Sequence, residues 1–256
     1  MNGLMHTREM LDVKDAIPVL LVGALWACAT TPSSSYEKTD GAAPGVTVKG
    51  HVTFVGTLPE LKASRIYRDS KLCGEEIMTE ELTVAEDSKG IEGVIVSLEG
   101  IPKGKPIQNP ETVVIENRGC RFVPSVATTV VGSSIDVQNT DPILHTTHAR
   151  LDSRFGPTLW NVVQPEGAAG VTKPLSTNAL IDIRCDLHPN MKSFVHVFRH
   201  PYFTITDAEG NFQLGKVPPG TYQLRVWHAK LGIREKPIAV PSRGVVTADV
   251  TIDLRR

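Results

Sequence analysis

Apolar and polar residues alternate in short runs along most of the chain after residue 45. A period of two places every second side chain on one face of a strand, so these runs predict half-buried β-strands. Glycine, proline, asparagine and aspartate separate the runs, as expected for turns. The runs cover residues 46–55, 93–98, 112–116, 134–138, 180–184, 194–198, 212–214, 221–227 and 245–254.

Helical periodicity is weak by comparison. Residues 58–72 could hold one helical turn or two, and no amphipathic helix stands out elsewhere. Many short strands separated by turns are typical of β-sandwiches. We therefore predict an all-β fold. A loop rich in glycine and proline at residues 100–106 and a second loop at residues 199–201 divide the chain into regions of different character.

Composition and charge exclude several classes of protein. With 256 residues, 41% of them hydrophobic, the chain can bury a core, and we do not expect disorder. Its 27 Lys and Arg residues balance 28 Asp and Glu residues, without the basic excess that is common in nucleic-acid binders. We therefore expect no nucleic-acid partner. Four cysteines are too few for a scaffold built on disulfides.

The N-terminus is similar to an export signal. Apolar residues 16–27 form a run shorter than a membrane span of about 20 residues, and such a run suits the core of a signal peptide. The tetrapeptide Leu25-Trp26-Ala27-Cys28 resembles a bacterial lipobox, whose cysteine becomes lipidated, although Trp26 departs from that pattern. We predict a signal peptide over residues 1–28, with Cys28 as a lipidation site. A plain signal peptide and a short buried strand are the alternatives.

A polar stretch rich in proline, serine and glycine follows Cys28. Residues 29–45 therefore predict a flexible linker. Together with the signal, this linker predicts a protein exported to the periplasm or outer cell envelope. Its contact with a membrane would be limited to an N-terminal lipid anchor.

Two stretches carry residues of the kinds that bind metals. His145 follows the strand predicted over 134–138. Cys185, His188 and Met191 share one short loop with the spacing Cys-x2-His-x2-Met. A thiolate, two imidazoles and a weak thioether are the ligands of a blue-copper electron-transfer site. We therefore predict one copper ion per chain, held by these four residues.

Each of these residues alone has an ordinary structural interpretation. A free cysteine is often buried, histidines occur in turns, and methionine fills cores. Their combined order at strand ends is poorly explained in that way. A c-type haem is disfavoured because the sequence has no Cys-x-x-Cys-His motif. Structural zinc prefers other ligand sets.

Residues 111–199 resemble a cupredoxin of the plastocyanin and amicyanin type. The run ETVVIENRGCRFVPSVATTVVGSSIDVQNTDPILH matches the first half of that family, and CDLHPNM matches its ligand loop in the short form of amicyanin. The resemblance implies a Greek-key β-sandwich. It also implies that His145, Cys185 and His188 are equatorial copper ligands and that Met191 is the axial ligand.

The chain departs from the family pattern beside the first histidine. Thr146 stands where such proteins usually carry asparagine, although its hydroxyl could still bond to the ligand loop. His148 is a surplus histidine in a His-x2-His pattern. His196 alternates with apolar neighbours and is expected to face solvent or a partner layer. A second metal site that uses His148, His200 or His228 is a weaker alternative.

Residues 202–254 have a different signature. The run YFTITDAEGNFQLGKVPPGTYQLRVWH reads as three strands joined by two turns and resembles a carboxypeptidase regulatory-like, or transthyretin-like, β-sandwich. Residues 46–100 are similar to the opening of such a module. The two flanks could form one sandwich split by an inserted cupredoxin, or the chain could hold three units in series. The regions we predict are 46–109, 110–200 and 201–256.

Two cysteines remain if Cys28 is lipidated and Cys185 binds copper. Leftover thiols often pair in an oxidising compartment, so we predict a disulfide between Cys73 and Cys120. Two separate buried thiols are the alternative.

The whole arrangement is similar to exported bacterial proteins described as methylamine-utilisation-like. The resemblances imply a type 1 (blue) copper protein that transfers single electrons to or from a redox partner protein. We do not expect an enzyme, because four protein ligands leave no open position for a substrate. The alternatives are periplasmic copper binding and delivery, and a structural or adhesion protein whose copper site has degenerated.

Overall fold

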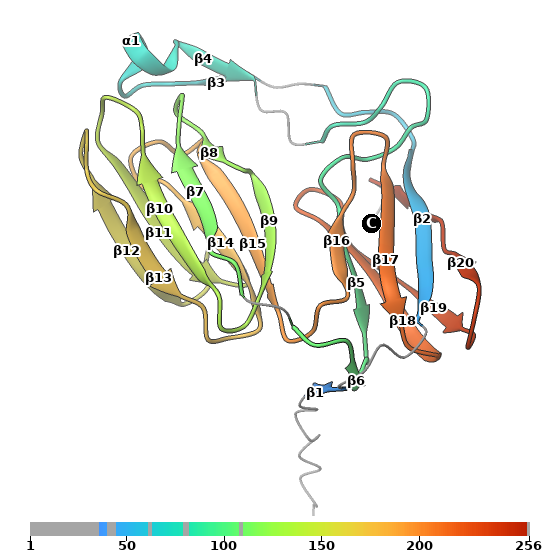
Figure 1. The fold of residues 1–256 in the computed structure, drawn as a ribbon. Coiled ribbons are helices and arrows are strands. Elements are labelled where there is room, and N and C mark those ends of the chain that lie inside the picture. Colours follow the sequence, from blue (N-terminus) through green and yellow to red (C-terminus); the bar gives the residue numbers. More distant parts are fainter. Residues whose placement is uncertain (1–35, 40–44, 61–62, 79–81, 108–109, 255–256) are drawn as a thin grey trace, which may run out of the picture. The chain divides into compact units, whose positions relative to one another are not determined.

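A computed structural model describes residues 36–39, 45–60, 63–78, 82–107 and 110–254 (Figure 1). The predicted signal peptide over residues 1–28, including Cys28, lies outside this part of the chain. Most of the predicted linker over residues 29–45 lies outside it too. These two predictions stay predictions.

The regular secondary structure of the described residues is almost entirely β-strand, so the predicted all-β class is confirmed. Residues 58–72 were expected to hold one or two helical turns, and the single-turn helix α1 (Ser70–Cys73) overlaps the end of that stretch. Among the described residues, no helix is both long and apolar enough to cross a membrane.

We call residues 113–198 the inner sandwich, because this region is inserted between two halves of another sandwich. One of its sheets has the order β13-β10-β7-β8, and the other has the order β12-β11-β14-β15-β9. The pairs β7–β10 and β9–β15 are parallel. In each case the chain visits the other sheet after the first strand of the pair and then returns to add the second. The bounds are β7 (Val113–Asn117), β8 (Phe122–Val123), β9 (Val126–Val130), β10 (Ser134–Asn139), β11 (His145–Leu151), β12 (Thr158–Gln164), β13 (Val171–Pro174), β14 (Ala179–Arg184) and β15 (Lys192–Phe198).

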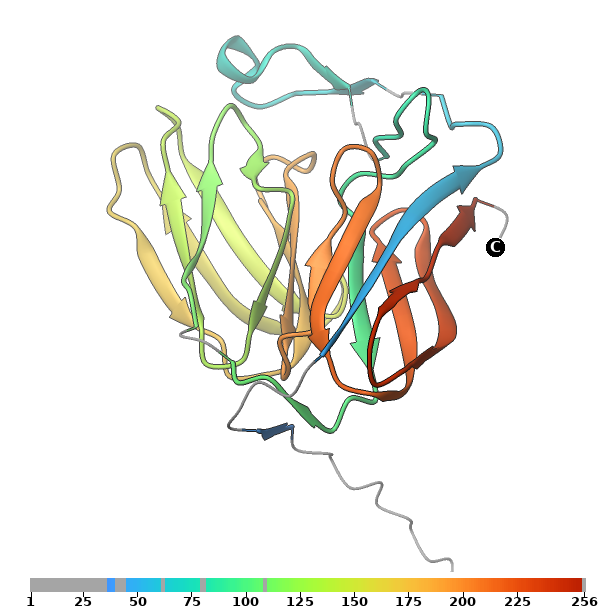
Figure 2. The ribbon, with the colours of Figure 1, turned by 45° about the vertical axis from the view of Figure 1, so that its right-hand side comes forward.

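The outer sandwich combines residues from both sides of this insertion. Its sheets have the orders β16-β5-β18-β19 and β17-β2-β20, and β21 also pairs with β2. Figure 2 shows the blue β2 between the orange β17 and the dark red β20 and β21. The bounds are β2 (Val46–Val55), β5 (Ile95–Glu99), β16 (Phe203–Ile205), β17 (Asn211–Val217), β18 (Gly220–His228), β19 (Gly232–Val240), β20 (Val245–Thr247) and β21 (Val250–Asp253).

The strand β2 lies in the middle of its sheet, with β17 on one side and β20 and β21 on the other, and its alternate side chains are apolar. Val46, Val48, Val52 and Phe54 are all buried in the core of the outer sandwich. Gly50 interrupts this series where the neighbouring chain approaches most closely. A Cβ atom at Gly50 would lie 2.7 Å from the carbonyl oxygen of Ala248. Glycine at this position therefore lets β20 and β21 pair one after the other with the same continuous strand, β2.

Short strands complete the described part. β3 (Ala63–Arg65) and β4 (Glu76–Met78) form a hairpin around α1, and β1 (Glu37–Lys38) pairs with β6 (Lys103–Gly104). The strand β1 falls within the predicted flexible linker. It is held there partly by Tyr36, whose hydroxyl donates to the carbonyl oxygen of Lys105 at 2.6 Å.

Aromatic side chains connect the inner and outer sandwiches. Phe194 on β15 meets Trp227 on β18 edge-on, with ring centroids 5.2 Å apart, and Phe198 stacks on Phe203 at 4.6 Å. His196 lies between these contacts on the same face of β15 and stacks on Phe198. Burial, together with the charge of Arg225, lowers the pKa of His196 to about 4. His196 was expected to face either solvent or a partner layer, and in the structure it faces a partner layer, the outer sandwich.

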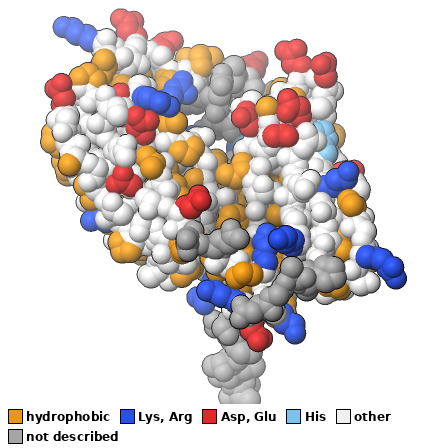
Figure 3. Space-filling view, in the orientation of Figure 1, with side chains coloured by type: hydrophobic (Ala, Val, Ile, Leu, Met, Phe, Trp, Pro, Cys, Tyr) orange, Lys and Arg blue, Asp and Glu red, His pale blue; other side chains and the backbone are white. Residues whose placement is uncertain are grey.

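Charged side chains are mixed over the surface. In Figure 3, basic and acidic side chains are interspersed on the visible face. This distribution agrees with the formal net charge of −1. It offers no single-sign field over that face to steer a partner.

Candidate metal centre

The four predicted ligands come from one strand end and one loop. His145 is the first residue of β11, while Cys185, His188 and Met191 belong to the loop that joins β14 to β15. Backbone hydrogen bonds close this loop, because the Met191 N–H donates to the His188 carbonyl oxygen at 2.9 Å and the Cys185 N–H points to the Met191 carbonyl oxygen at 3.4 Å. The loop is therefore short and internally braced.

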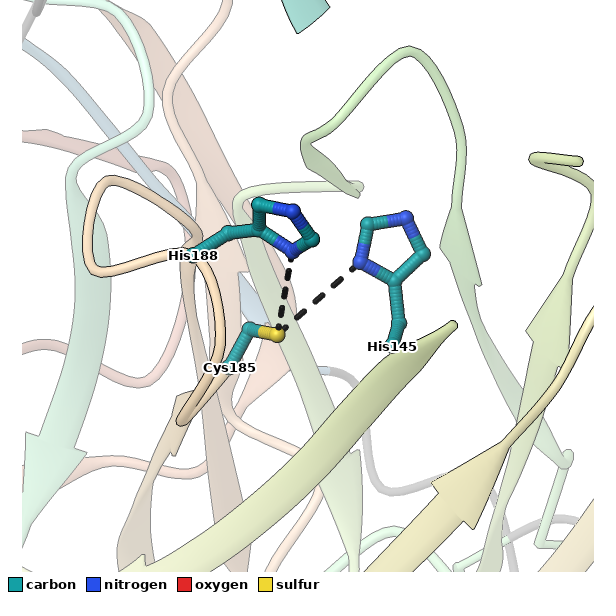
Figure 4. Close-up of side chains that lie close together, drawn as sticks. All are labelled: His145, Cys185 and His188. Carbon is teal, nitrogen blue, oxygen red and sulfur yellow. Dashed lines mark hydrogen bonds between the residues drawn. The ribbon is translucent and has the colours of Figure 1, made fainter. Parts of the chain in front are cut away.

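Three of the four side chains converge on one point (Figure 4). The Nδ1 atoms of His145 and His188 lie 3.9 and 3.6 Å from the Cys185 sulfur. All three residues are buried, with exposed fractions of 0% for His145, 3% for Cys185 and 1% for His188. The cluster is thus enclosed by protein.

These separations suit a bound metal ion. Zinc, for example, forms bonds of roughly 2.0–2.1 Å to nitrogen and roughly 2.3 Å to sulfur, and its tetrahedral angles hold such atoms about 3.5–3.6 Å apart. The distances in the cluster are close to this range, so a metal ion needs little rearrangement. The thiol and the two imidazoles fit a soft or borderline ion such as copper.

Met191 lies in the same loop and is 1% exposed. It belongs to the core of the inner sandwich together with Cys120 and Cys185. Its burial beside the cluster is compatible with the predicted axial role. Coordination by its thioether remains a prediction.

Asp141 holds the imidazole of His145 from the side opposite the sulfur. The His145 Nε2 atom lies 2.9 Å from Asp141 Oδ2. The carboxylate also accepts the Gly119 and Cys120 N–H groups at 2.6 and 2.9 Å. Burial opposes its charge, but these hydrogen bonds and His145 together lower the pKa of Asp141.

Asp69 does the same for the second imidazole. The His188 Nε2 atom lies 3.1 Å from Asp69 Oδ2. Asp69 precedes α1 and is 119 positions from His188 in the sequence. A carboxylate on the outer nitrogen fixes the tautomer and ring orientation of a metal-binding histidine. Both imidazoles in the cluster have such a partner.

Thr146 bonds to the ligand loop, as expected. Its hydroxyl accepts the Asp186 N–H at 2.8 Å. Its backbone N–H also points to the Cys185 sulfur at 3.5 Å. Threonine thus links β11 to the ligand loop.

The structure joins Cys73 to Cys120 in a disulfide, while Cys185 is a free, buried cysteine. The bridge connects the end of α1 with the inner sandwich. Cys120 lies against the site, because its carbonyl oxygen accepts the Asn190 side-chain N–H at 3.2 Å.

The other histidines of the described residues do not join the cluster. The His148 Nδ1 atom lies 3.0 Å from Asp186 Oδ1, and its Nε2 atom lies 2.8 Å from the Thr158 hydroxyl. Within the described ranges, neither candidate group of metal ligands includes His148, His200 or His228. The second such group contains Cys120, whose sulfur is already in the disulfide.

The surroundings of Cys185 favour its thiolate. Burial acts to raise the pKa of the thiol, but hydrogen bonds from His145, Thr146 and His188 outweigh it and lower the pKa to about 6. The thiolate is both the nucleophilic and the metal-binding form of cysteine. The protein thus prepares the sulfur for a metal ion at neutral pH.

This thiolate can be measured directly. We expect the ultraviolet thiolate absorbance of the metal-free protein to rise with a midpoint near pH 6. Because folding lowers this pKa from 9.0, the group stabilises the fold at high pH, and that contribution is lost as the pH falls toward 6. The Cys185→Ser variant serves as the blank. A midpoint near 9 for the Cys185-dependent signal would contradict the expectation.

The two carboxylates were not among the predicted site residues. Asp141 could have been found, because it lies four positions before His145 in the Asn-x-Asp-x3-His run. Asp69 gave no such signal, because it lies in an irregular stretch far from the ligand loop. Only the folded chain brings it to His188.

Comparison with known proteins gives matches in structure alone. Models of known protein families do not match the chain, and a search of curated proteins also finds no match.

Solved structures similar to part of the chain include cupredoxins and a copper-containing nitrite reductase. The nitrite reductase, from Thermus scotoductus SA-01, has 22% identity and a TM-score of 0.29 over 38% of this chain and 24% of its own. A purple cupredoxin from Nitrosopumilus maritimus has 17% identity and a TM-score of 0.28 over 33% of this chain and 98% of its own. Amicyanin from Paracoccus versutus has 12% identity and a TM-score of 0.30 over 40% of this chain and 96% of its own.

Proposed function

We propose that the chain binds one copper ion and transfers single electrons. The observation that carries this proposal is the convergence of the Cys185 sulfur with the Nδ1 atoms of His145 and His188 inside a closed pocket. A bound copper ion would supply the one-electron change. In the proposal Met191 is the fourth, weak ligand.

The residues around the site act by holding the ligand atoms still. Asp141 and Asp69 fix the two imidazoles, and the backbone hydrogen bonds of the ligand loop fix Cys185 relative to Met191. A preorganised site changes little when the charge of the metal changes. A small rearrangement favours rapid electron transfer, and the closed ligand set leaves no place for a substrate. We therefore propose a carrier and not an enzyme.

The disulfide supports an extracytoplasmic location. Cys73 and Cys120 form a bond that is typical of oxidising compartments. We propose that the protein is exported to the periplasm or outer envelope and exchanges electrons there with a partner protein. Lipidation of Cys28 would provide its anchor.

Spectroscopy of the copper-loaded protein tests the proposal. Copper(II) added to the metal-free chain should produce an intense visible charge-transfer band, saturating at one ion per chain, because a short copper–thiolate bond gives rise to it. Rapid removal of that copper by a mild chelator would favour copper delivery instead. A folded chain that binds no copper would favour the alternative of a structural or adhesion protein whose copper site has degenerated.

The role of Met191 has its own test. Met191→Gln should retain copper but lower the reduction potential, because an oxygen donor stabilises Cu(II) relative to a thioether. Cyclic voltammetry of both proteins measures the difference. Met191→Leu is the matched control of similar volume and should raise the potential by removing the donor. Equal potentials in all three proteins would remove Met191 from the ligand set.

A further inference from the structure

The outer edge of His188 is covered by a separate segment of the chain. We call β3, α1 and β4 together, residues 63–78, the capping segment. His188 directs Nδ1 at the Cys185 sulfur, so its Nε2 edge faces away from the cluster. That edge meets Asp69 of the capping segment, and the imidazole is only 1% exposed.

A shared cavity also places the same segment near the ligand loop. Ile66 and Arg68 line one cavity together with Leu187 and Asn190. Asp69 is therefore the point at which a longer stretch of chain meets the ligand loop.

The disulfide fixes the position of Asp69. The Asp69 carbonyl oxygen accepts the N–H groups of Leu72 and Cys73 at 2.9 Å, which makes residues 69–73 one tight turn. Asp69 itself has a φ of 55°, a left-handed conformation that few residues other than glycine adopt. Cys73 then anchors the turn to Cys120.

Cys120 also supports the other half of the site. Its N–H donates to Asp141, which holds His145, and its carbonyl oxygen accepts from Asn190 of the ligand loop. One disulfide thus joins the two carboxylates that hold the two imidazoles. The disulfide thus ties the capping segment covalently to Cys120, and hydrogen bonds connect Cys120 to the residues around the metal centre.

We propose that Asp69 is a positioning residue for His188, and that the Cys73–Cys120 disulfide keeps it in place. The inference rests on the proposed copper function for its purpose, although the positioning itself needs no metal. Asp69 accepts a hydrogen bond from Nε2–H, which keeps the ring proton on Nε2 and leaves the Nδ1 lone pair free for the metal ion. Its negative charge also stabilises Cu(II) relative to Cu(I).

The tautomer of His188 tests this proposal without copper. The variants are compared in a full-length, metal-free Cys185→Ala background throughout this test, because the Cys185 thiolate lies 3.6 Å from His188 Nδ1 and would otherwise compete for a proton on that atom. In this background, ¹⁵N chemical shifts of the imidazole should show the Nε2–H form. Asp69→Ala should shift His188 to a mixture of tautomers. Asp69→Asn should largely restore the Nε2–H form, because the amide oxygen can still accept a hydrogen bond from Nε2–H. The matched control is Glu76→Gln, which removes an exposed carboxylate from the same segment and should change nothing.

The copper-loaded protein separates charge from geometry. Asp69→Asn and Asp69→Ala should both raise the reduction potential, while only Asp69→Ala should also broaden the visible band. An unchanged tautomer in Asp69→Ala, or an equal change in Glu76→Gln, overturns the proposal. Because the tautomer is read without metal, a chain that binds no copper would defeat the proposed function and leave this result standing.

Reduction of the disulfide tests the tether. Dithiothreitol should convert it to two thiols and shift His188 toward the tautomer mixture of Asp69→Ala. The Cys73→Ala/Cys120→Ala variant should behave like the reduced protein. A wild-type His188 signal in both would overturn the role of the tether.

Discussion

Replacing Cys185 with serine is expected to abolish the intense visible absorption of the copper-loaded protein completely. The band would arise from charge transfer between the thiolate and Cu(II), and a hydroxyl cannot supply it. Because Cys185 is the free cysteine of the described residues, no neighbouring thiol in that part of the chain can replace it. An absorption spectrum of both proteins after equal copper loading measures the effect.

The control removes the other two described cysteines. The Cys73→Ser/Cys120→Ser variant should keep the band, since its sulfurs are bonded to each other and lie outside the proposed ligand set. Its stability should fall by about 2–5 kcal/mol, the usual cost of removing a native disulfide. If this variant remains folded and loses the band while Cys185→Ser retains it, the ligand assignment is wrong.

The second large effect concerns the outer sandwich. The isolated fragment 201–256 should show no cooperative thermal transition, although it contains six of the eight strands of that sandwich. Without β2, the strands β17, β20 and β21 lose the partner with which each of them pairs. Without β5, β16 loses its partner, and β18 loses one of two.

A deletion of the inner sandwich provides the matched comparison. Residues 46–107 joined by a short glycine-serine linker to residues 201–256 should melt cooperatively, because β5 and β16 are adjacent antiparallel strands on either side of the deletion. Circular dichroism of both polypeptides distinguishes them. A well-folded monomeric 201–256 fragment would contradict this account and favour units in series.

The sequence predicted the features that depend on local pattern. Strand β2 was recognisable from its alternating side chains, and its predicted bounds are those of the structure. The ligand loop was recognisable from the spacing of Cys185, His188 and Met191. In both cases the residues that carry the information are close together in the chain.

Features that depend on distant contacts were missed. Strand β11 begins His145-Thr146-Thr147, three polar residues that are all buried, so no alternation marks it. Strand β19 contains Pro237, which argues against a strand but is tolerated because β19 is at the edge of its sheet. Residues 245–254 were predicted as one strand, whereas a break at Ala248 divides them into β20 and β21.

The central position of β2 has a consequence for the order in which the chain acquires structure. The partners of β2 lie in residues 211–253, so its neighbours are synthesised last. The inner sandwich makes its own sheets from residues 113–198 and can close earlier. Pairing strands so distant in sequence has a high entropic cost of loop closure, which slows the search for the native state. Refolding should therefore proceed in two phases, with the copper-binding half complete before the outer sandwich forms.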